Sequence, residues 1–496
     1  MKGRDNMNKE DQEKKPTPPA KTHVRMKLFP FTMLIFGLVI VTAIVTFFAL
    51  TMGEDKVVDV VSPQTDRQEF KKIYDVYDEL QANYFSEFKE EDLIEGAVNG
   101  MVDALDDPYT DYLSKEESKQ LTESISSSFE GIGAEIRESD NYIRIVSPIK
   151  NSPAEKAGLL PNDLVLTVDG QSIQGMTSSE AVMLIRGEKG SKVTLEIKRG
   201  DEEPFKVDIT RDVIPIETVY AEKLNERIGH IQITSFADDT YNELVQAIQQ
   251  FEKDGMEGLV IDLRQNPGGR LDTALDISDL FIPEGKGIMQ YEDKNGKTQL
   301  YTASSGDKIA VPLAFLIDDG SASASEILAG AIKESTDIPV VGLTSFGKGT
   351  VQTPKELKDG STLKMTTANW LTPSGKHIHE QGIEPDYVVE YPPYASLPFL
   401  NPETPMKEGD VSAQVKVAQQ MLEATGYLQV KPDGAYGAKT VQAVQALQRA
   451  KQLPVDGILQ NETTFALMDA LRETLKENDP QMQKAQQLVE EQLQKK

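Results

Sequence analysis

The chain has 496 residues, contains no cysteine and carries a formal net charge of −28 at pH 7. This length predicts several domains, each large enough for its own core, and the negative charge argues against nucleic acid as a partner. The absence of cysteine excludes disulfide bonds and thiol catalysis and suits a bacterial protein outside the cytoplasm.

An uncharged segment occupies residues 28–53. As a helix it would span about 39 Å, enough to cross a hydrocarbon core of about 30 Å with some tilt. Residues 1–27 carry eight basic and four acidic side chains, a net charge of +4 that predicts a cytoplasmic location. The alternative is a cleaved signal peptide, but Ala49-Leu50-Thr51 is a poor cleavage site. We expect a cytoplasmic tail at 1–27, a single-pass transmembrane anchor at 28–53 and extracellular domains from Glu54 onward.

Residues 64–118 are predicted to be helical, because their apolar side chains recur at helical spacing. This segment offers apolar surface for a homodimer. It ends in Leu-Asp-Asp-Pro-Tyr-Thr-Asp-Tyr-Leu at 105–113.

Residues 119–211 show a different pattern, of short strands around one strong helix start. Ser152 is a predicted N-cap, Pro153 occupies the first turn, Glu155 completes a capping box and Gly158 ends the helix. A strand that runs into a turn follows at 163–170.

Residues 212–392 contain two apolar runs that predict buried strands, Leu313–Ile317 and Ile338–Val341. The first run leads to Gly-Ser-Ala-Ser-Ala-Ser-Glu at 320–326, and helical spacing begins after it. The serines therefore occupy a sharp turn from a strand to a helix, where a nucleophile is exposed and helix N–H groups can hold an oxyanion.

The second run leads to Phe-Gly-Lys-Gly-Thr-Val-Gln at 346–352. Lys348 could act as a base if burial lowered its pKa by roughly three units, and the neutral amide of Gln352 could orient the amine without raising that pKa. On these residues alone, a helix cap and a solvated lysine remain an alternative. The pattern also does not distinguish Ser321, Ser323 and Ser325 as the nucleophile.

A third segment, 258–269, is a predicted strand that ends in Pro267-Gly268-Gly269. The N–H groups of these glycines can approach a substrate closely, although an ordinary type II turn has the same sequence.

Two other chemistries are disfavoured. Gly342–Lys348 matches the first seven positions of a phosphate-binding loop, but Gly349 replaces the required Ser or Thr and an extended segment follows. A histidine triad is also disfavoured, since the chain has only His23, His230, His377 and His379. His23 precedes the uncharged segment, and His377 and His379 form a His-Ile-His pair without acidic or cysteine ligands at metal spacing. We therefore expect neither a cofactor nor a metal ion.

The C-terminal region begins with a proline-rich linker at 393–410. Residues 411–475 contain a weak internal repeat, in which the Asp-Gly at 433–434 recurs at 456–457. Apolar residues at helical spacing precede each Asp-Gly pair. Residues 476–496 are expected to be a polar tail that frays.

The stretch Leu313–Gln352 resembles the catalytic region of the C-terminal processing peptidases, which are tail-specific serine proteases with a Ser/Lys dyad. The resemblance implies that Ser323 is the nucleophile, Lys348 the base and Gln352 the residue that positions the lysine. The Pro-Gly-Gly turn resembles the oxyanion segment of the family. It implies an oxyanion hole formed by Gly268 or Gly269 together with the N–H of Ala324.

Residues 119–211 resemble a PDZ domain over its full length. The resemblance implies that Gly131, Ile132 and Gly133 form the loop that binds a peptide's terminal carboxylate, beside a helix at 179–185. Arg186 lies at the end of this helix and could couple peptide binding to assembly of the dyad. A solvated arginine that complements the helix dipole is the alternative.

Two further segments resemble parts of known families. Residues 105–113 are similar to the Leu-Asp-Pro-His-Ser-Xaa-Tyr signature of the peptidases, with one residue inserted and tyrosine in place of histidine. Residues 411–475 resemble a small helical peptidoglycan-binding domain, in which Gln460 replaces the usual glycine of the second repeat. The alternative is a module that only packs on the protease or supports a dimer.

The expected architecture is multidomain α/β: membrane helix, helical segment, mixed α+β PDZ domain, α/β protease core and small all-α C-terminal domain. The expected function is that of a membrane-anchored serine endopeptidase outside the cytoplasm. It would recognise exposed protein C-termini and bind the cell wall. One alternative is a non-catalytic scaffold that uses the PDZ and wall-binding modules. A cell-wall hydrolase is disfavoured, because the core lacks the paired carboxylates of a glycosidase and the zinc ligands of an amidase.

Overall fold

The computed structural model describes residues 67–139, 141–200, 202–304 and 309–495, together with Met33 and Thr42. Apart from these two residues, the predicted tail and transmembrane anchor lie outside the described residues. Within the described part of the chain, no helix is both long enough and apolar enough to cross a bilayer.

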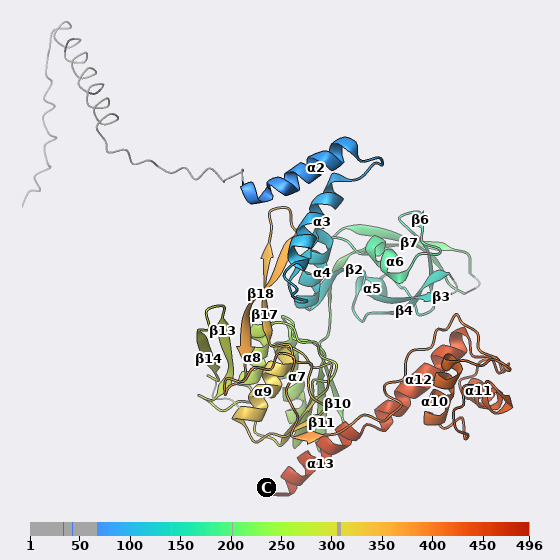
Figure 1. The fold of residues 1–496 in the computed structure, drawn as a ribbon. Helices are drawn as coiled ribbons and strands as arrows, with labels where there is room; N and C mark the ends of the chain where they lie inside the picture. Colours follow the sequence, from blue (N-terminus) through green and yellow to red (C-terminus); the bar gives the residue numbers. More distant parts are fainter. Residues whose placement is uncertain are drawn as a thin grey trace, which may run out of the picture. The chain divides into compact units, whose positions relative to one another are not determined.

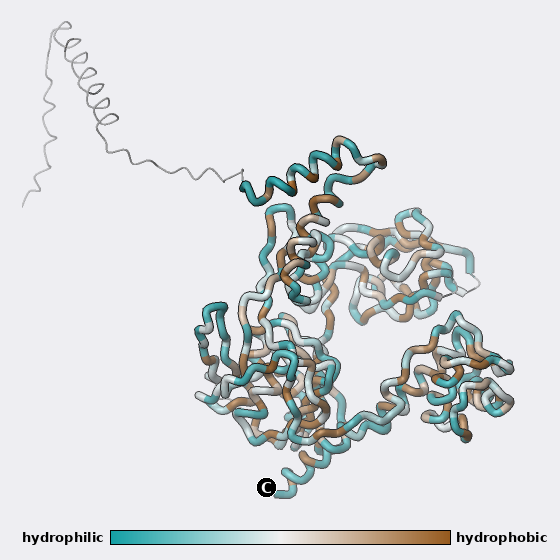
Figure 2. The backbone as a smooth tube through the Cα atoms, in the orientation of Figure 1, coloured by the Kyte–Doolittle hydropathy of each residue, from teal (hydrophilic) through white to brown (hydrophobic). Residues whose placement is uncertain are grey.

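The first described helices form a short, amphipathic N-terminal segment. Hydrophilic and hydrophobic residues alternate along α2 in Figure 2, and none of its residues is buried. The elements of this segment are η1 (Gln68–Phe70), α2 (Lys71–Asn83) and α3 (Glu90–Asp103). Helix α4 (Lys115–Ile125) follows and begins with a capping box, in which Ser114 and Glu117 exchange hydrogen bonds.

The segment predicted to be a PDZ domain contains a six-stranded antiparallel sheet with a buried aliphatic core. Its predicted helix start is present, since Ser152 Oγ accepts a hydrogen bond from the Glu155 N–H. A separate strand pair, β2 (Ser128–Gly131) with β9 (Asp212–Pro215), flanks it. The elements of the six-stranded sheet and its two helices are β3 (Ala134–Ser139), β4 (Tyr142–Pro148), α5 (Pro153–Lys156), β5 (Leu164–Val168), β6 (Gln171–Ser172), α6 (Ser178–Ile185), β7 (Lys192–Lys198) and β8 (Phe205–Thr210).

The segment predicted to be the protease core is built on a six-stranded sheet in the order β10-β11-β12-β15-β16-β19. The first pair is antiparallel and the others are parallel, so the carboxyl ends of β12, β15 and β16 meet at one edge. The strands are β10 (Val219–Lys223), β11 (Ile228–Ile233), β12 (Gly258–Asp262), β15 (Leu313–Ile317), β16 (Val340–Gly342) and β19 (Tyr387–Val388).

Both faces of this sheet are covered, which explains why its central strands are continuous apolar runs. Alternate residues of β12 and β15 face the main core, where three helices pack on them. The covering helices are α7 (Thr240–Lys253), α8 (Leu271–Asp279) and α9 (Ala324–Ser335). The intervening residues Val260, Ala314 and Leu316 face a second core on the opposite side.

A second, antiparallel sheet carries part of the site. Strand β18 (Thr362–Leu371) is central and pairs with β1, β13 and β17. The other strands are β1 (Asp111–Leu113), β13 (Gly287–Asp293), β14 (Thr298–Thr302) and β17 (Thr350–Glu356). Residues that precede the PDZ segment in the sequence therefore join the protease core through β1.

The C-terminal module consists of α10 (Ala413–Ala424), α11 (Ala438–Ala450) and α12 (Asn461–Glu477). Its internal repeat is structural: Gln419 donates to Asp433 and Thr440, and Gln448 donates to Asp456 and Thr463. The predicted linker at 393–410 is not a free spacer. Leu400 and Met406 are buried and belong to the apolar core of this module.

The expected polar tail at 476–496 is wrong for most of its length. Residues Pro480–Lys495 form α13, which packs on the protease sheet (red in Figure 1). Its buried residues Ala485, Leu488 and Val489 cover the second face of the sheet. Gly258 permits this contact, because an added Cβ would lie 2.4 Å from Val489 Cγ1.

Candidate active site

Ser323 lies in the turn between β15 and α9, with φ 55° and ψ −112°. This conformation is unfavourable for a residue with a side chain and resembles the strained turn of a nucleophile elbow. Ser321 and Ser325 are fully buried, and their hydroxyls donate to Leu263 O at 2.8 Å and Asn266 O at 2.9 Å. Of these three serines, Ser323 is the one whose side chain lines the cleft described below.

The Pro-Gly-Gly turn packs directly against Ser323. A Cβ added to Gly268 would lie 2.6 Å from Ala322 O and 2.9 Å from Ala324 N, and its φ of 98° also favours glycine. The Gly268 N–H donates to Asn266 Oδ1 at 2.9 Å. Within the described chain, the N–H groups of Gly269 and Ala324 have no hydrogen-bond acceptor. These two donors are therefore the ones available to a ligand.

A buried carboxylate joins the two segments of the site. Glu326 Oε2 accepts the N–H groups of Ser323 and Lys348, each at 2.8 Å. Glu326 Oε1 accepts the Ser345 hydroxyl and the Gly347 N–H, each at 2.6 Å. Glu326 was not among the residues predicted from the sequence, although Ser-Ala-Ser-Glu at 323–326 has the spacing of a capping box.

Lys348 is partly buried in the same cleft. Burial lowers the pKa of its ammonium group, and the positive charge of Lys364 lowers it further, whereas Glu326 acts in the opposite direction. Its Nζ lies 5.0 Å from the centre of the Tyr109 ring. Among the described residues, no hydrogen bond joins Lys348 Nζ to Ser323.

Gln352 lies on β17 and also lines the cleft. Its amide donates to Thr350 Oγ1 at 2.8 Å and to Thr366 Oγ1 at 3.3 Å. Within the described part of the chain it makes no hydrogen bond to Lys348, so the structure brings the two residues to one cleft but does not join them.

The cleft has a volume of about 780 Å³ and is lined mainly by apolar side chains. Its polar lining includes Ser323, Lys348 and Gln352, and its other charged side chains are Lys364, Arg270 and Asp272. Helix α4 contributes Leu121, Ser124 and Ile125. The first residues of the segment predicted to be a PDZ domain are thus part of the cleft wall.

The predicted carboxylate-binding loop lies at the start of α5. The Ala154 N–H donates to Ile132 O at 2.8 Å, and a Cβ at Gly133 would lie 2.5 Å from Ser152 Cβ. Arg186 stacks on the Phe129 ring at 4.6 Å and forms an ion pair of 2.5 Å with Glu123 on α4. The predicted coupling residue therefore contacts the helix that borders the active-site cleft.

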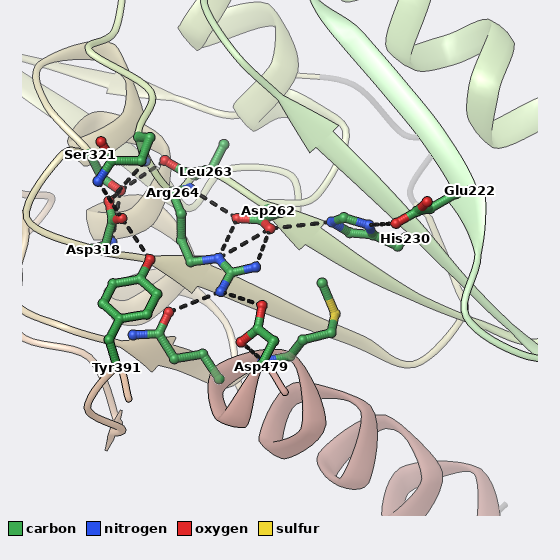
Figure 3. Close-up of polar contacts among 12 residues, drawn as sticks. Glu222, His230, Asp262, Leu263, Arg264, Asp318, Ser321, Tyr391 and Asp479 are labelled. Carbon is green, nitrogen blue, oxygen red and sulfur yellow. Dashed lines mark hydrogen bonds and ion pairs between the residues drawn. The ribbon is translucent and has the colours of Figure 1, made fainter. Parts of the chain in front are cut away.

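Behind the turn that carries Ser323 lies a network of polar and charged side chains, of which Asp262 is fully buried and Glu222 is exposed (Figure 3). His230 bridges Glu222 and Asp262 at 3.2 Å each, and Asp262 pairs with Arg264 at 2.7 Å. Burial would raise the pKa of Asp262, but the charge of Arg264 and the hydrogen bonds with His230 and Arg264 lower it to about 2. Arg264 also pairs with Asp479, at 2.7 Å, just before α13.

This network reaches the catalytic turn through Asp318. The Gln265 N–H donates to Asp318 Oδ1 at 2.9 Å, and Ser321 N–H donates to Asp318 O at 3.0 Å. Tyr391 donates to Asp318 Oδ2 at 2.8 Å (Figure 3). The segment between Arg264 and Gly268 thus connects α13 to the serine turn.

Comparison with known proteins identifies four regions. Residues 227–389 match Peptidase family S41, and residues 144–199 match a PDZ domain. Residues 39–117 match the activating protease CtpB N-terminal domain, and residues 411–467 match a peptidoglycan binding domain.

Whole-chain relatives agree with these matches. The chain is 46% identical over 454 residues to the carboxy-terminal processing protease CtpA of Bacillus subtilis, covering 91% of this chain and 97% of that protein. It is 40% identical over 420 residues to the carboxy-terminal processing protease CtpB of the same organism, covering 84% of this chain and 88% of that protein. A solved photosystem II D1 C-terminal processing protease aligns over 65% of this chain and 87% of its own, with 28% identity and a TM-score of 0.39. The predicted family and the predicted serine-type endopeptidase are confirmed, and the chain belongs to the carboxy-terminal processing proteases of peptidase family S41.

Proposed function

We propose that this protease acts outside the cytoplasm, anchored by residues 28–53, and cleaves proteins near their C-termini with a Ser323/Lys348 dyad. The single observation that carries the dyad is the Glu326 carboxylate, which holds the backbone of both residues at one cleft. The buried hydroxyls of Ser321 and Ser325 support the choice of serine.

In the proposed mechanism, Ser323 Oγ attacks the scissile carbonyl carbon while its proton passes to the neutral amine of Lys348. The carbonyl oxygen becomes an oxyanion, which accepts hydrogen bonds from the N–H groups of Ala324 and Gly269; the N–H of Gly268, the other predicted donor, already bonds to Asn266. Lys348 then protonates the leaving amine, and water hydrolyses the acyl-enzyme by the reverse sequence. The lowered pKa of Lys348 supports this role, because only the neutral amine can accept the proton.

Two adjustments complete the site in this mechanism. The Lys348 side chain turns from the Tyr109 ring toward Ser323, and the Gln352 amide leaves Thr350 or Thr366 to orient the amine. Both residues already line the cleft, so these are side-chain movements.

Substrate recognition is assigned to the PDZ domain, whose Gly131-Ile132-Gly133 loop would bind the terminal carboxylate. We infer that Arg186 couples this binding to the cleft, and its ion pair with Glu123 supplies a physical link to α4. The measurement is peptide-stimulated cleavage by Arg186→Ala beside Arg186→Lys. Loss of stimulation with an unchanged basal rate is the expected result, whereas full stimulation in Arg186→Ala would exclude coupling through this residue.

The remaining modules are assigned by the same proposal. The match at 411–467 supports peptidoglycan binding, and the exposed apolar residues of α2 and α3 support a homodimer through residues 64–118. The uncharged segment and the positive charge before it support a single-pass anchor with a cytoplasmic N-terminus.

Mass spectrometry of an unfolded model protein incubated with the full chain in detergent tests the dyad. Cleavage should be lost in Ser323→Ala and Lys348→Ala and kept in the control variants Ser374→Ala and Lys376→Ala, which lie outside the cleft. Cleavage by Lys348→Ala at the wild-type rate would exclude lysine as the base. If no form cleaves even with a hydrophobic C-terminal peptide present, the alternative of a non-catalytic scaffold gains support.

A further inference from the structure

Two sequence motifs have no role in the proposed mechanism: the Leu105–Leu113 signature with tyrosine in place of histidine, and the His-Ile-His pair at 377–379. The structure brings both to the catalytic lysine. Lys348 Nζ lies over the Tyr109 ring, 5.0 Å from its centre. This ring and the His379 ring form an edge-to-face pair, with 6.0 Å between the ring centres.

The backbone of Tyr109 is fixed by hydrogen bonds on the side of β18. Asp107 accepts the Tyr109 N–H at 3.0 Å and the Thr110 hydroxyl at 2.6 Å. Thr110 Oγ1 in turn accepts the Thr366 N–H at 3.0 Å. The backbone that carries the partly buried Tyr109 ring is therefore tied to the sheet that carries Gln352.

The backbone of Lys348 is equally fixed on the other side. Its carbonyl accepts the Trp370 indole N–H at 2.9 Å, and its N–H donates to Glu326. A Cβ on Gly349 would lie 2.9 Å from His379 N, so the turn is in direct contact with the segment that supports Tyr109. Because the Lys348 backbone is held by these contacts, its amine can reach Ser323 only by a rotation of the Lys348 side chain.

An aromatic face attracts an ammonium ion through its quadrupole but has little attraction for a neutral amine. The ring therefore stabilises the protonated form of Lys348. The other charges around the lysine are Lys364, which disfavours that form, and Glu326, which favours it. The acidic groups that face Tyr109 are Glu326, Asp107 and Glu380.

We propose that Tyr109 is a positioning residue that holds the Lys348 ammonium away from Ser323 in the resting enzyme. In this role it sets the pH above which the lysine can act as the base. The inference rests on the proposed Ser323/Lys348 dyad. Deprotonation of Lys348 removes its attraction to the ring and frees the amine for Ser323.

The test is the pH dependence of kcat/KM for the full chain, which reports the ionisation of the free enzyme. Tyr109→Leu removes the aromatic face, so the acid-side midpoint should move to lower pH by about 0.4–0.7 unit, with an unchanged plateau at high pH. Tyr109→Phe keeps the face and should leave the midpoint in place. Tyr109→Trp offers a stronger face and should move the midpoint to higher pH.

Thermal unfolding of each variant identifies any that fails to fold. If Tyr109→Leu does not fold, the midpoints of Tyr109→Phe and Tyr109→Trp test the role of the aromatic face. A midpoint that is the same in every folded variant would overturn the inference, as would equal shifts in Tyr109→Leu and Tyr109→Phe. The failure of the dyad itself is distinguishable. If the dyad is wrong, Lys348→Ala retains activity. If Lys348→Ala is inactive but the Tyr109 variants do not shift the midpoint, the dyad stands and only the role of Tyr109 is contradicted.

Discussion

At the scale of single residues, the charge of Lys348 depends on burial and on groups from two different elements. Burial and Lys364 on β18 lower its pKa, and Glu326 on α9 raises it. In the proposed mechanism, Lys348 must lose its proton before it can accept one from Ser323, so cleavage should rise as pH increases through this pKa.

Replacing Lys364 with methionine removes the like charge and keeps much of the apolar stem. The pKa of Lys348 should then rise, and the acid-side midpoint of kcat/KM should move to higher pH by roughly 0.5 unit. Lys355→Met on neighbouring β17 is the matched control, and its midpoint should equal that of the wild type. A midpoint that moves to lower pH in Lys364→Met would contradict this assignment of the charge.

The Glu326 carboxylate accepts hydrogen bonds from four donors, so it should not tolerate an amide. In Glu326→Gln, either orientation of the amide points its NH₂ group at two of these donors. We expect a decrease of about 2–3 kcal/mol in the free energy of unfolding and at least a tenfold loss of kcat. Denaturant unfolding and initial rates measure the two quantities.

The matched control is Glu334→Gln, the same change on the same helix away from the catalytic turn. It should keep the wild-type kcat. Comparable kcat values for Glu326→Gln and the wild type would show that the carboxylate is not needed to align the two segments.

The sequence predicted the proposed pair, Ser323 and Lys348, but not the contacts that bring their backbones together. The apolar runs before residues 320 and 346 predicted the strand ends correctly, because parallel strands buried on both faces are continuously apolar. The choice among Ser321, Ser323 and Ser325 needed the family resemblance. The physical difference is that two of the hydroxyls are buried and bonded to main-chain carbonyls, and that difference exists only in the folded chain.

At the scale of elements, α13 is the main departure from the sequence prediction. Its composition is mostly Glu, Gln and Lys, which predicted a frayed tail. Yet Ala485, Leu488 and Val489 have the spacing of one helical face. This narrow face is sufficient because the sheet opposite it presents small residues, Gly258 and Ala314.

Leu488→Ala tests whether α13 belongs to the protease core. Removing a side chain that is 7% exposed should lower the free energy of unfolding by about 2–5 kcal/mol. Gln487→Ala, on the exposed side of the same helix, should change it by less than about 0.5 kcal/mol. Equal, small effects of both substitutions on the unfolding midpoint would mean that the helix does not contribute to the core.

At the scale of the whole molecule, the module at 411–467 lies in the sequence between two parts of the protease core, β19 and α13. The two ends of this insertion meet, because the Gln481 amide donates to Val389 O at 2.9 Å. Asp479 and Gln481 both contact Arg264, which connects them to the segment behind the serine turn. The module and the protease core should therefore be separable only if α13 is kept.

An internal deletion and a C-terminal truncation separate these contributions. Replacing residues 393–477 with a Gly/Ser linker of about six residues removes the module but keeps Tyr391, Asp479 and α13, and a flexible chain of this length spans the short gap. This variant should cleave an unfolded protein at a rate similar to that of the full chain and should lose binding to peptidoglycan in a sedimentation assay. Truncation after Asp410 removes α13 as well, exposes Val260 and Leu316 to water, and should abolish cleavage. If the truncated chain cleaves as well as the internal deletion, α13 is dispensable for the protease and the buried network around Arg264 does not support the catalytic turn.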